Sequence, residues 1–489
     1  MINMDMDTIA AFSTPPGESG LAVLRISGSH AASICDRLFV PSSSRFAKPS
    51  AMVGYTLAHG YWGKIDEVVL ACFRAPHSYT GEDVYEISCH GGQAIRQAVL
   101  DSVLAAGARP AGPGEFSRRA FFNGKMDLTA AEAVMDMIGA QAEKQAQAAY
   151  RQLTGGVSRV IHERTDHLYG ALARLEMLLD WDEEEERPED RELLVSELEY
   201  AERELRLLAD SFAGGRIIRE GLAVVIAGSP NVGKSTLLNA LSGRDRAIVS
   251  NIPGTTRDTV EVDLTLDGYL VHLTDTAGLA IDSDDPIERE GIVRAENALR
   301  TADLILWVLS PPLPPEDERR EEEARIDRCL AEGKEILFVL GKDDLRPTLS
   351  AEKDPAHYAA ERYPDLPSMT WSDRSEDDLQ RLKETLVRFI ESGSLMSPVE
   401  SAEITAHDQV KSHGEGQSHG LLTHARHKAA VDRAVELVKN ARADLQAGLS
   451  FDLVAISLKE ALTELSTITG EDVSETLIDK IFSRFCIGK

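Results

Sequence analysis

The sequence predicts an α/β domain with a mostly parallel sheet, set between two helical segments. A phosphate-loop pattern, G-x-x-x-x-G-K-[ST], begins at Gly228 and lies between a strand-like apolar run and a helical pattern. Apolar runs that alternate with helical stretches, as a parallel sheet requires, cover residues 222–227, 303–309 and 335–340. Helical periodicity covers residues 128–212 and returns from about residue 421, so helices flank the α/β domain in sequence.

The phosphate loop predicts a nucleotide site. Its glycines let successive N–H groups face an anionic phosphate, and the following helix adds the positive end of its dipole. We expect Lys234 to reach the terminal phosphates and the Ser235 hydroxyl to ligate Mg²⁺. The predicted nucleotide contacts in this segment are Asn231, Val232, Gly233, Lys234, Ser235 and Thr236.

Two segments after the loop predict sensing of the terminal phosphate. Residues 254–258 read Gly-Thr-Thr-Arg-Asp, and we assign the Thr256 hydroxyl to Mg²⁺. Two strand-like runs, joined by the hairpin signal Asp267-Gly268, cover residues 259–266 and 269–274. We expect Asp275 to hold Mg²⁺ through water and the Gly278 N–H to sense the γ-phosphate. The predicted nucleotide contacts here are Asp275, Thr276, Ala277 and Gly278.

The motif at residues 341–344, Gly-Lys-Asp-Asp, predicts selection of guanine. The Asp344 carboxylate is placed to accept hydrogen bonds from the N1 and N2 hydrogens of guanine, and adenine lacks that donor pair. The sequence therefore favours GTP over ATP. The remaining predicted contacts near the base are Lys342, Ser372, Asp373 and Arg374.

Leu279 indicates that the hydrolytic water is not oriented in the usual way. Many small GTPases have a glutamine at this position, directly after D-x-x-G, and a leucine cannot orient water. The acidic stretch at residues 282–288 is the obvious alternative source, although most of its carboxylates are expected to be solvated. The Asn231 amide could bind a monovalent cation or make an ordinary loop hydrogen bond, and spacing alone does not decide between them.

Motifs outside the α/β domain extend over nearly the whole chain. They include residues 24–28 (Leu-Arg-Ile-Ser-Gly), 78–84 (Ser-Tyr-Thr-Gly-Glu-Asp-Val), 90–92 (His-Gly-Gly), 113–117 (Pro-Gly-Glu-Phe-Ser) and 123–128 (Asn-Gly-Lys-Met-Asp-Leu). The chain ends with Phe-Cys-Ile-Gly-Lys at residues 485–489. This set resembles the MnmE (TrmE) family of tRNA-modification GTPases.

The resemblance implies three parts. An N-terminal α/β domain (1–123) would bind folate and form the homodimer, and a GTPase domain (219–390) would interrupt a helical domain (124–218 and 391–489). It also implies hydrolysis of GTP to GDP and phosphate, activated by K⁺-dependent pairing of GTPase domains. With the FAD-containing partner MnmG, the family modifies carbon 5 of the wobble uridine of certain tRNAs. The one-carbon donor would be 5,10-methylenetetrahydrofolate or 5-formyltetrahydrofolate.

The resemblance also implies roles for individual residues. The K⁺ ligands would be Asn231, Ser250, Ile252 and Thr255, and the Mg²⁺ ligands Ser235 and Thr256. Ser250, Thr255 and Thr256 are thereby also predicted nucleotide contacts. Glu288 would orient the hydrolytic water, so the catalytic candidates are Lys234, Glu288 and the terminal-motif cysteine Cys486. The folate contacts would be Arg25, Glu86, Lys125 and Lys489.

Two positions depart from the family pattern. Gly341 replaces the asparagine of Asn-Lys-x-Asp, which removes a contact to the base and to the phosphate loop worth about 1–3 kcal/mol. Asp373 puts a carboxylate near the base, where the family has a Ser-Ala-Lys-like segment. Guanine preference should survive through Asp344, whereas nucleotide affinity is expected to change unless a water or a neighbour fills the gap.

Composition limits the partners and the compartment. The net charge of −29 argues against broad nonspecific binding of nucleic acid. A tRNA would have to be held by a partner protein or meet a local basic surface, for which Arg118, Arg119 and Lys125 are one candidate. The five scattered cysteines form no disulfide framework or metal motif, which suits the cytoplasm. Neither a signal peptide nor an apolar run near the roughly 18 residues of a membrane span is expected.

Two other functions stay open. A regulatory switch that binds RNA or ribosomes would be expected to carry a basic RNA-binding module, and this acidic chain shows none. A nucleotide-binding scaffold with little hydrolysis is suggested only by Gly341 and Asp373.

Two local patterns concern structure and metal binding. Gly214-Gly215 predicts a break ahead of the GTPase domain. The histidines within residues 407–427 fit no ligand spacing for a metal.

Overall fold

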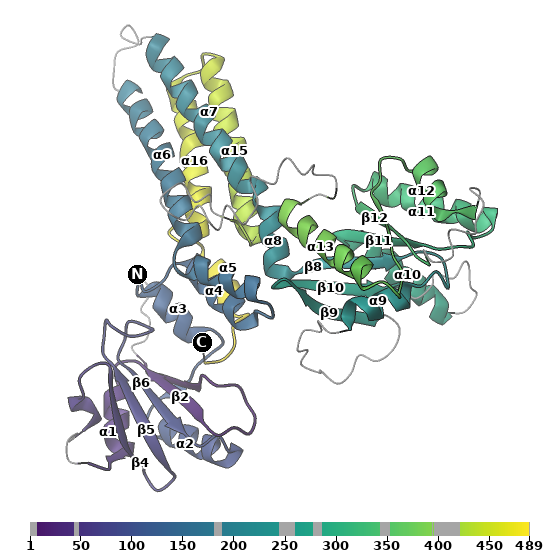
Figure 1. Cartoon of the computed structure of the whole chain (residues 1–489). Coiled ribbons are helices and arrows are strands. Elements are labelled where there is room, and N and C mark those ends of the chain that lie inside the picture. Colours follow the sequence, from purple (N-terminus) through teal and green to yellow (C-terminus); the bar gives the residue numbers. More distant parts are fainter. Residues whose placement is uncertain are drawn as a thin grey trace. The chain divides into compact units, whose positions relative to one another are not determined.

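The structure is a computed structural model that describes residues 7–43, 48–179, 188–243, 260–276, 286–342, 353–393, 395 and 421–488 (Figure 1). The chain divides into two compact units, one of Met1–Met135 with Thr463–Lys489 and one of Asp136–Leu462. The predicted domain boundaries at residues 123, 218 and 390 stay predictions. Within the described ranges, none of the helices combines the length and the apolar character needed to cross a membrane.

The first unit contains a seven-stranded sheet in the order β3-β4-β5-β6-β2-β1-β7. Its strands are β1 (Ile9–Phe12), β2 (Ala22–Ser27), β3 (Phe39–Pro41), β4 (Thr56–Trp62), β5 (Asp66–Phe73), β6 (Val84–Cys89) and β7 (Arg109–Pro110). Neighbouring strands are antiparallel except β1 and β7, which are parallel. One face packs its alternate residues, including Leu24, Leu70 and Ile87, against helices α1 (Ala31–Leu38) and α2 (Gln93–Ala105).

The C-terminal tail belongs to this first unit. Helix α17 (Glu475–Phe482) packs against α3 (Glu115–Phe122), and Phe482 and Phe485 share an apolar cluster with Leu128 of α4 (Leu128–Gly139). After the cluster, Ile487 forms a bridge with Pro113, and the Gly114 N–H donates to the Cys486 carbonyl at 3.4 Å. Cys486 and Ile487 therefore lie against the segment that begins α3.

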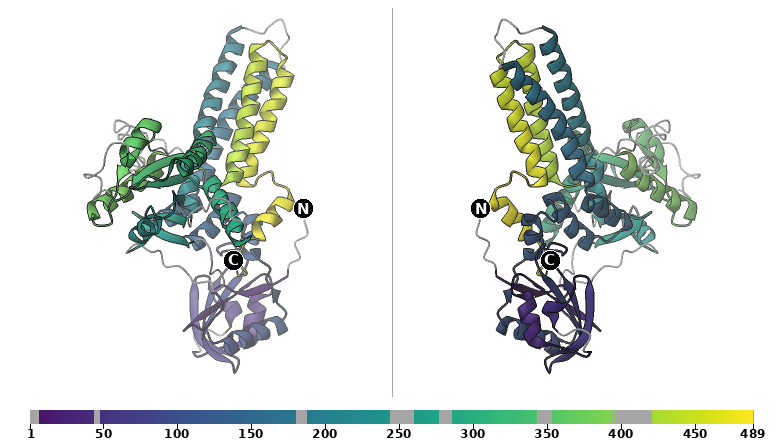
Figure 2. Two further views of the ribbon diagram at one scale, coloured as in Figure 1. Left: turned by 90° about the vertical axis from the view of Figure 1, so that its right-hand side faces the viewer. Right: turned by 90° about the vertical axis from the view of Figure 1, so that its left-hand side faces the viewer.

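The helical part of the second unit is built from segments on both sides of the α/β domain. Before that domain come α5 (Glu143–Leu153), α6 (Gly156–Leu179), α7 (Pro188–Asp210) and α8 (Phe212–Glu220), and after it come α15 (Ala425–Gln446) and most of α16 (Phe451–Thr469). Helix α7 runs beside α15 (Figure 2), and the Arg442 guanidinium pairs with Glu202 at 3.0 Å. The two segments form one bundle, so the prediction of a GTPase domain inserted into helical material is confirmed.

Helix α8 corrects one reading of the sequence. Gly214 and Gly215, predicted to break the chain, lie inside this helix, which ends at Glu220 before Gly221. A Cβ at Gly215 would overlap the backbone carbonyl of Leu422. The glycine is thus needed for a close approach of two chain segments far apart in sequence, rather than for a turn.

The inserted α/β domain has a six-stranded sheet in the order β13-β12-β11-β8-β10-β9, which is parallel except for the β9–β10 pair. The strands are β8 (Leu222–Ala227), β9 (Val260–Leu266), β10 (Tyr269–Asp275), β11 (Leu304–Leu309), β12 (Glu335–Leu340) and β13 (Ser368–Thr370). The helices are α9 (Lys234–Ser242), α10 (Pro286–Thr301), α11 (Glu316–Ala331), α12 (Pro355–Arg362) and α13 (Glu376–Ser392). Alternate residues of β8 belong to two apolar clusters: Val224 and Ile226 lie in one, and Val225 and Ala227 lie in the other. Strand β8 is therefore covered on both faces.

The predicted hairpin is confirmed at the Asp267-Gly268 turn. Both residues have positive φ, 47° and 81°, which is the backbone of a two-residue type I′ turn. The antiparallel register pairs Tyr269 with Leu266 and continues to Asp275 opposite Val260. Strand β10 also pairs with β8, so this hairpin delivers Asp275 to the end of the sheet where the phosphate loop begins.

Candidate functional site

The phosphate loop connects the end of β8 to the start of α9. Gly228 has φ 135°, and a Cβ there would overlap the carbonyl oxygen of Val308 on the neighbouring strand. Gly233 has φ 105° and directly precedes the first residue of α9, Lys234. Both glycines are therefore required by the backbone, which turns sharply so that the helix N-terminus opens toward the loop.

Lys234 is folded over this loop. Its ammonium group donates to the carbonyl oxygens of Gly228 at 2.9 Å and Ser229 at 2.8 Å. Burial lowers the pKa of Lys234, and the charges of Asp275 and Glu322 oppose that shift. An ammonium has three N–H donors, so one remains for a phosphate oxygen after the two bonds to the loop.

Of the residues predicted to hold Mg²⁺, Ser235 and Asp275 lie in the described part of the chain and Thr256 does not. The Ser235 hydroxyl donates to Asp275 Oδ2 at 2.8 Å, and Asp275 is 4% exposed. Its other oxygen, Oδ1, is buried and has no hydrogen-bond partner among the described residues. A hydroxyl and a carboxylate with an unpaired oxygen are ligands that suit Mg²⁺, so the residues present fit the ion.

Thr276 fixes the end of β10, and its side chain points into the protein instead of toward a nucleotide. Its N–H and its hydroxyl both donate to the Ile226 carbonyl, at 3.2 and 2.8 Å. Thr276 is 1% exposed, so this part of the predicted nucleotide contact set lies inside the protein. The two bonds hold Asp275 in register beside the last residues of β8.

The predicted base-side residues lie at the ends of β12 and β13. Lys342 follows β12, has φ 55°, and donates from Nζ to the carbonyl of Asn231 at 3.3 Å. Ser372 is buried and its hydroxyl accepts from the Arg374 N–H at 3.3 Å, whereas Asp373 and Arg374 are exposed. The structure therefore brings Lys342 against the phosphate loop, with Ser372 holding the turn that follows β13.

Several predicted site residues fall outside the described parts of the chain. These are Ser250, Ile252, Thr255, Thr256, Ala277, Gly278, Asp344 and Lys489. Glu288 lies in helix α10, but its side chain is not among those described. Their assigned roles remain predictions.

A second predicted site lies in the first unit, around Arg25. Arg25 on β2 and Glu86 on β6 are direct cross-strand partners, and their side chains meet at 2.8 Å. The Arg25 guanidinium also lies over the rings of Tyr79 and Phe116, with centroid distances of 4.8 and 5.5 Å. Its NH1 atom is buried without a hydrogen-bond partner in the described residues. An unpaired donor beside two rings fits a planar, hydrogen-bonding ring system such as that of folate.

The other predicted folate-site residues are placed separately. Lys125 is exposed, and a Cβ at Gly81 would lie 3.3 Å from its Cγ, so its stem runs along the 78–84 loop. Cys486 is exposed, and its carbonyl accepts from Gly114, two residues before Phe116. The start of α3 thus supports both the tail cysteine and one of the rings beneath Arg25.

One member of the predicted basic patch, Arg119, does not lie at the surface. The Arg119 side chain is 8% exposed and pairs with Asp7, Glu82 and Glu115. Arg118 pairs with Asp479 at 3.0 Å. Because Arg119 is itself buried and paired with these partly buried carboxylates, it does not belong to an exposed basic patch, and its place in the predicted trio is wrong.

One residue beside the phosphate loop, Glu322, was not predicted from the sequence. Glu322, on α11, accepts hydrogen bonds from both the N–H and the hydroxyl of Ser229. It lies about 90 residues beyond the loop in a run of charged residues typical of a solvated helix. The helical period of α11 places residue 322 on the same face as the buried Ile326 and Cys329, which indicates burial of Glu322 but not its contact with the phosphate loop.

The inserted parallel α/β domain, with a lysine and a serine at the start of α9 and an aspartate at the end of β10, defines a P-loop GTPase. Two family models match the chain, the MnmE helical domain over residues 128–486 and the N-terminus of the GTP-binding protein TrmE over residues 8–125. The chain belongs to the MnmE (TrmE) family, as its motifs predicted.

Relatives named tRNA modification GTPase MnmE align over nearly the full length. The protein of Roseiflexus sp. (strain RS-1) is 41% identical over 488 residues, 99% of each chain. That of Geobacillus kaustophilus is 38% identical over 492 residues, covering 99% of this chain and 100% of the relative. Among solved structures, Era of Aquifex aeolicus bound to GDP and AlF4⁻ is 24% identical over 44% of this chain. Its TM-score of 0.28 is too low to support a structural argument.

Proposed function

We propose that this chain hydrolyses GTP to GDP and phosphate in order to drive modification of tRNA at carbon 5 of the wobble uridine. The observation that carries the proposal is the Ser235–Asp275 pair beside Lys234, in a chain whose family is that of tRNA modification GTPases. The modification would be carried out in a complex with an FAD-containing partner, MnmG. The proposed cofactors are Mg²⁺, K⁺ and a tetrahydrofolate.

The mechanism follows from what each residue can do at the phosphates. Lys234 keeps one N–H donor free for a phosphate oxygen while its other two fix the loop. Ser235 and Asp275, with Thr256, would hold Mg²⁺, which supplies neutralisation of charge on the β- and γ-phosphates. Asp344 would accept from N1 and N2 of guanine, and Glu288 would orient the attacking water.

A monovalent ion site is proposed at Asn231. Its backbone adopts a left-handed conformation with φ 62°, and the residue is exposed at the open side of the loop. With Ser250, Ile252 and Thr255 it would hold K⁺ when two GTPase domains face each other. This arrangement would supply positive charge at the phosphates beyond that of Lys234 and Mg²⁺.

We further propose that the first unit forms the homodimer through the open face of its sheet. Neighbouring strands there expose large apolar side chains: Val40, Leu57, Tyr61 and Val69. Tyr55, just before β4, is 71% exposed. A contiguous apolar patch of this kind usually marks an interface, and a second copy of the chain would cover it.

Steady-state hydrolysis of GTP and of ATP, each in KCl and in NaCl at matched ionic strength, tests the nucleotide part. We expect turnover of GTP only, and faster turnover in KCl. Equal rates in both salts would contradict the ion site at Asn231. No turnover of GTP would favour a nucleotide-binding scaffold with little hydrolysis. Glu288→Ala should reduce turnover sharply while nucleotide affinity stays nearly unchanged.

The folate and tRNA parts need separate measurements. Arg25→Leu should weaken binding of 5-formyltetrahydrofolate by calorimetry and leave GTP turnover unchanged, with Arg37→Leu on the exposed surface as the control. Mass spectrometry of tRNA nucleosides after reaction with the MnmG partner tests the modification itself. Wobble uridine that stays unmodified in the complete reaction would contradict the proposal.

A further inference from the structure

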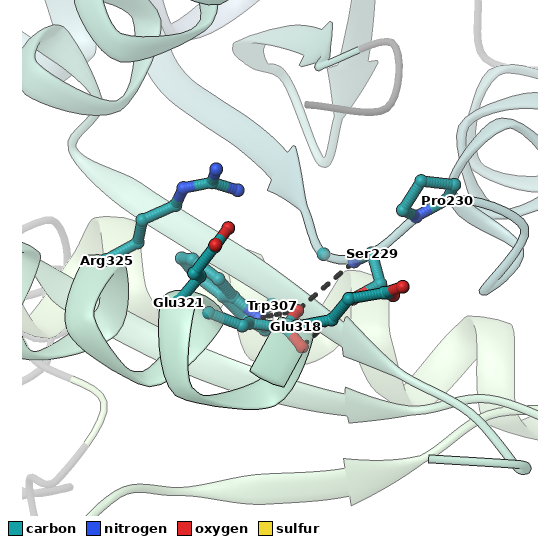
Figure 3. Close-up of a pocket in the computed structure, with 8 residues that line it drawn as sticks. Ser229, Pro230, Trp307, Glu318, Glu321 and Arg325 are labelled. Carbon is teal, nitrogen blue, oxygen red and sulfur yellow. Dashed lines mark hydrogen bonds between the residues drawn. The ribbon is translucent and has the colours of Figure 1, made fainter. Parts of the chain in front are cut away.

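The carboxylate of Glu322 lies behind the phosphate loop, in a small pocket between the loop and α11. Glu322 is buried, with 6% of its surface exposed. Ser229 and Pro230 line the loop side of the pocket, and the exposed Glu318 and Glu321 line its α11 side (Figure 3). A carboxylate buried at such a place is tolerated only when hydrogen bonds compensate for its lost hydration.

Three donors converge on this carboxylate. Oε1 accepts from the Ser229 N–H at 3.2 Å and from Trp307 Nε1 at 2.8 Å, and Oε2 accepts from the Ser229 hydroxyl at 3.0 Å. Burial raises the pKa of Glu322, and the hydrogen bonds from Trp307 and Ser229 oppose the rise. Trp307 is itself fixed, because it is 1% exposed and lies on β11 paired with Ala227 at the end of β8.

Lys234 holds the same loop residue from the other side. Its Nζ donates to the Ser229 carbonyl, while Glu322 accepts from the Ser229 N–H. The backbone of Ser229 is thus held between an anion and a cation at the point where the loop leaves β8. A rotation of this backbone would move a carbonyl acceptor of Lys234 and redirect the N–H groups that follow.

We propose that Glu322 is a positioning residue for the phosphate loop. By fixing Ser229 against Trp307, it keeps Lys234 and the loop N–H groups aimed at the phosphates of bound GTP. Glu322 acts through Ser229 and Lys234 and makes no contact with the nucleotide. The inference rests on the hydrolysis of GTP proposed above.

The test compares Glu322→Ala and Glu322→Gln in the full-length chain, with Glu318→Ala as the matched control on the same helix. GTP turnover is measured in KCl, together with the affinity for a fluorescent GDP analogue and the melting temperature. We expect kcat/KM of Glu322→Ala to fall about tenfold or more, because two buried N–H groups lose their acceptor. Glu318→Ala should behave as the parent protein.

Glu322→Gln separates positioning by hydrogen bonds from an effect of charge. The glutamine Oε1 can accept from both N–H groups, and its Nε2 can donate to the Ser229 hydroxyl, which is able to reverse its role. We therefore expect Glu322→Gln to stay within about threefold of the parent in kcat/KM. A glutamine variant as impaired as Glu322→Ala would overturn the proposal.

Three further outcomes are decisive. Glu322→Ala with the kinetics and affinity of Glu318→Ala would also overturn it. If Glu322→Ala does not fold, the double variant Ser229→Ala with Trp307→Phe removes two of the three donors, and an unchanged kcat/KM would contradict the role of Glu322. A parent protein with no GTP turnover would count against the proposed function instead, and the affinities for the GDP analogue would still decide the role of Glu322.

Discussion

The Ser235 hydroxyl donates a hydrogen bond to the Asp275 carboxylate at 2.8 Å, which joins the start of α9 to the end of β10. The second Asp275 oxygen is buried and unpaired within the described residues. One carboxylate oxygen of Asp275 is therefore hydrogen-bonded to Ser235, and the other has no partner among the described residues. Such an arrangement is prepared for a cation with oxygen ligands.

Asp275→Asn should weaken the apparent affinity for Mg²⁺ in GTP hydrolysis about 10- to 100-fold, the range typical when the outer ligands of a metal are lost. The amide retains the shape of the side chain but carries no negative charge. Turnover as a function of Mg²⁺ concentration measures the effect. Asp263→Asn on the adjacent β9, where Asp263 pairs with His272, is the control and should leave the Mg²⁺ dependence unchanged.

Gly341→Asn should tighten binding of GTP about fivefold or more, because it restores a side-chain amide next to the phosphate loop, a contact worth about 1–3 kcal/mol. Space is available, since a Cβ at Gly341 would lie 3.5 Å from the Val232 carbonyl oxygen and 3.7 Å from that of Leu309. Calorimetric titration with a non-hydrolysable GTP analogue checks the change. Gly341→Ala fills the same space without the amide, and an equal gain from both variants would show that the amide is not responsible.

Gly488→Ala should release the C-terminal tail from the first unit. Gly488 has φ 99°, and a Cβ there would overlap the Phe12 carbonyl. Strain of this kind costs about 1–3 kcal/mol, which exceeds what the Ser13–Gly488 hydrogen bond returns. Hydrogen exchange at Gly114, whose N–H bonds to the Cys486 carbonyl, should become faster.

Gly124→Ala is the matched control for the tail variant. Gly124 also has positive φ, 66°, but a Cβ there would meet nothing within 4 Å. It therefore introduces backbone strain without a collision. Unchanged exchange at Gly114 in Gly488→Ala would mean that the tail is not held by this contact.

Asp136→Asn should lower the free energy of unfolding at neutral pH by about 1–3 kcal/mol. Asp136 accepts from His424 at 2.7 Å and from Arg219 at 2.9 Å, and so ties α4 to α8 and to the residue before α15. Burial alone would raise the pKa of Asp136, but His424 and Arg219 lower it below the ordinary value of 3.8.

The sign of the pH dependence follows from that lowered pKa. The ionised Asp136 stabilises the fold above its unfolded pKa, and this stabilisation is lost as pH falls through the lower folded pKa. Urea unfolding at several pH values should show a difference between parent and Asp136→Asn that is constant near neutrality and shrinks below about pH 4. The exposed Asp166→Asn on α6 should show no such difference, and a pH-independent loss in Asp136→Asn would contradict the ion-pair explanation.

Residues close together in the chain were predictable because their chemistry is local. The phosphate loop, the Asp267-Gly268 turn and the alternation of strands and helices each depend on backbone preferences within a few residues. The insertion of the GTPase domain was also predictable, since helical periodicity appears on both sides of it. The placement of Asp275 followed from the hairpin that delivers it.

Residues whose role depends on distant segments could not be read in this way. Gly214-Gly215 was predicted to break the chain, yet Gly215 lies inside α8, where its missing side chain leaves room for the Leu422 carbonyl. Arg119 was predicted to belong to a basic surface patch, yet its side chain is buried against Asp7 and Glu82. Neither contact leaves a pattern within the neighbouring sequence.

The sequence by itself determined the class of protein, its inserted domain and the lysine, serine and aspartate of the nucleotide site. The tertiary structure alone decided that Glu322 lies behind Ser229, that Thr276 is internal, and that the tail rests on the start of α3. The physical reason is that local backbone preferences and contacts between distant segments are set by different residues. Backbone conformation and periodicity are set by nearby residues, whereas burial and the partner of a charged group are set by whichever distant segment the fold brings alongside.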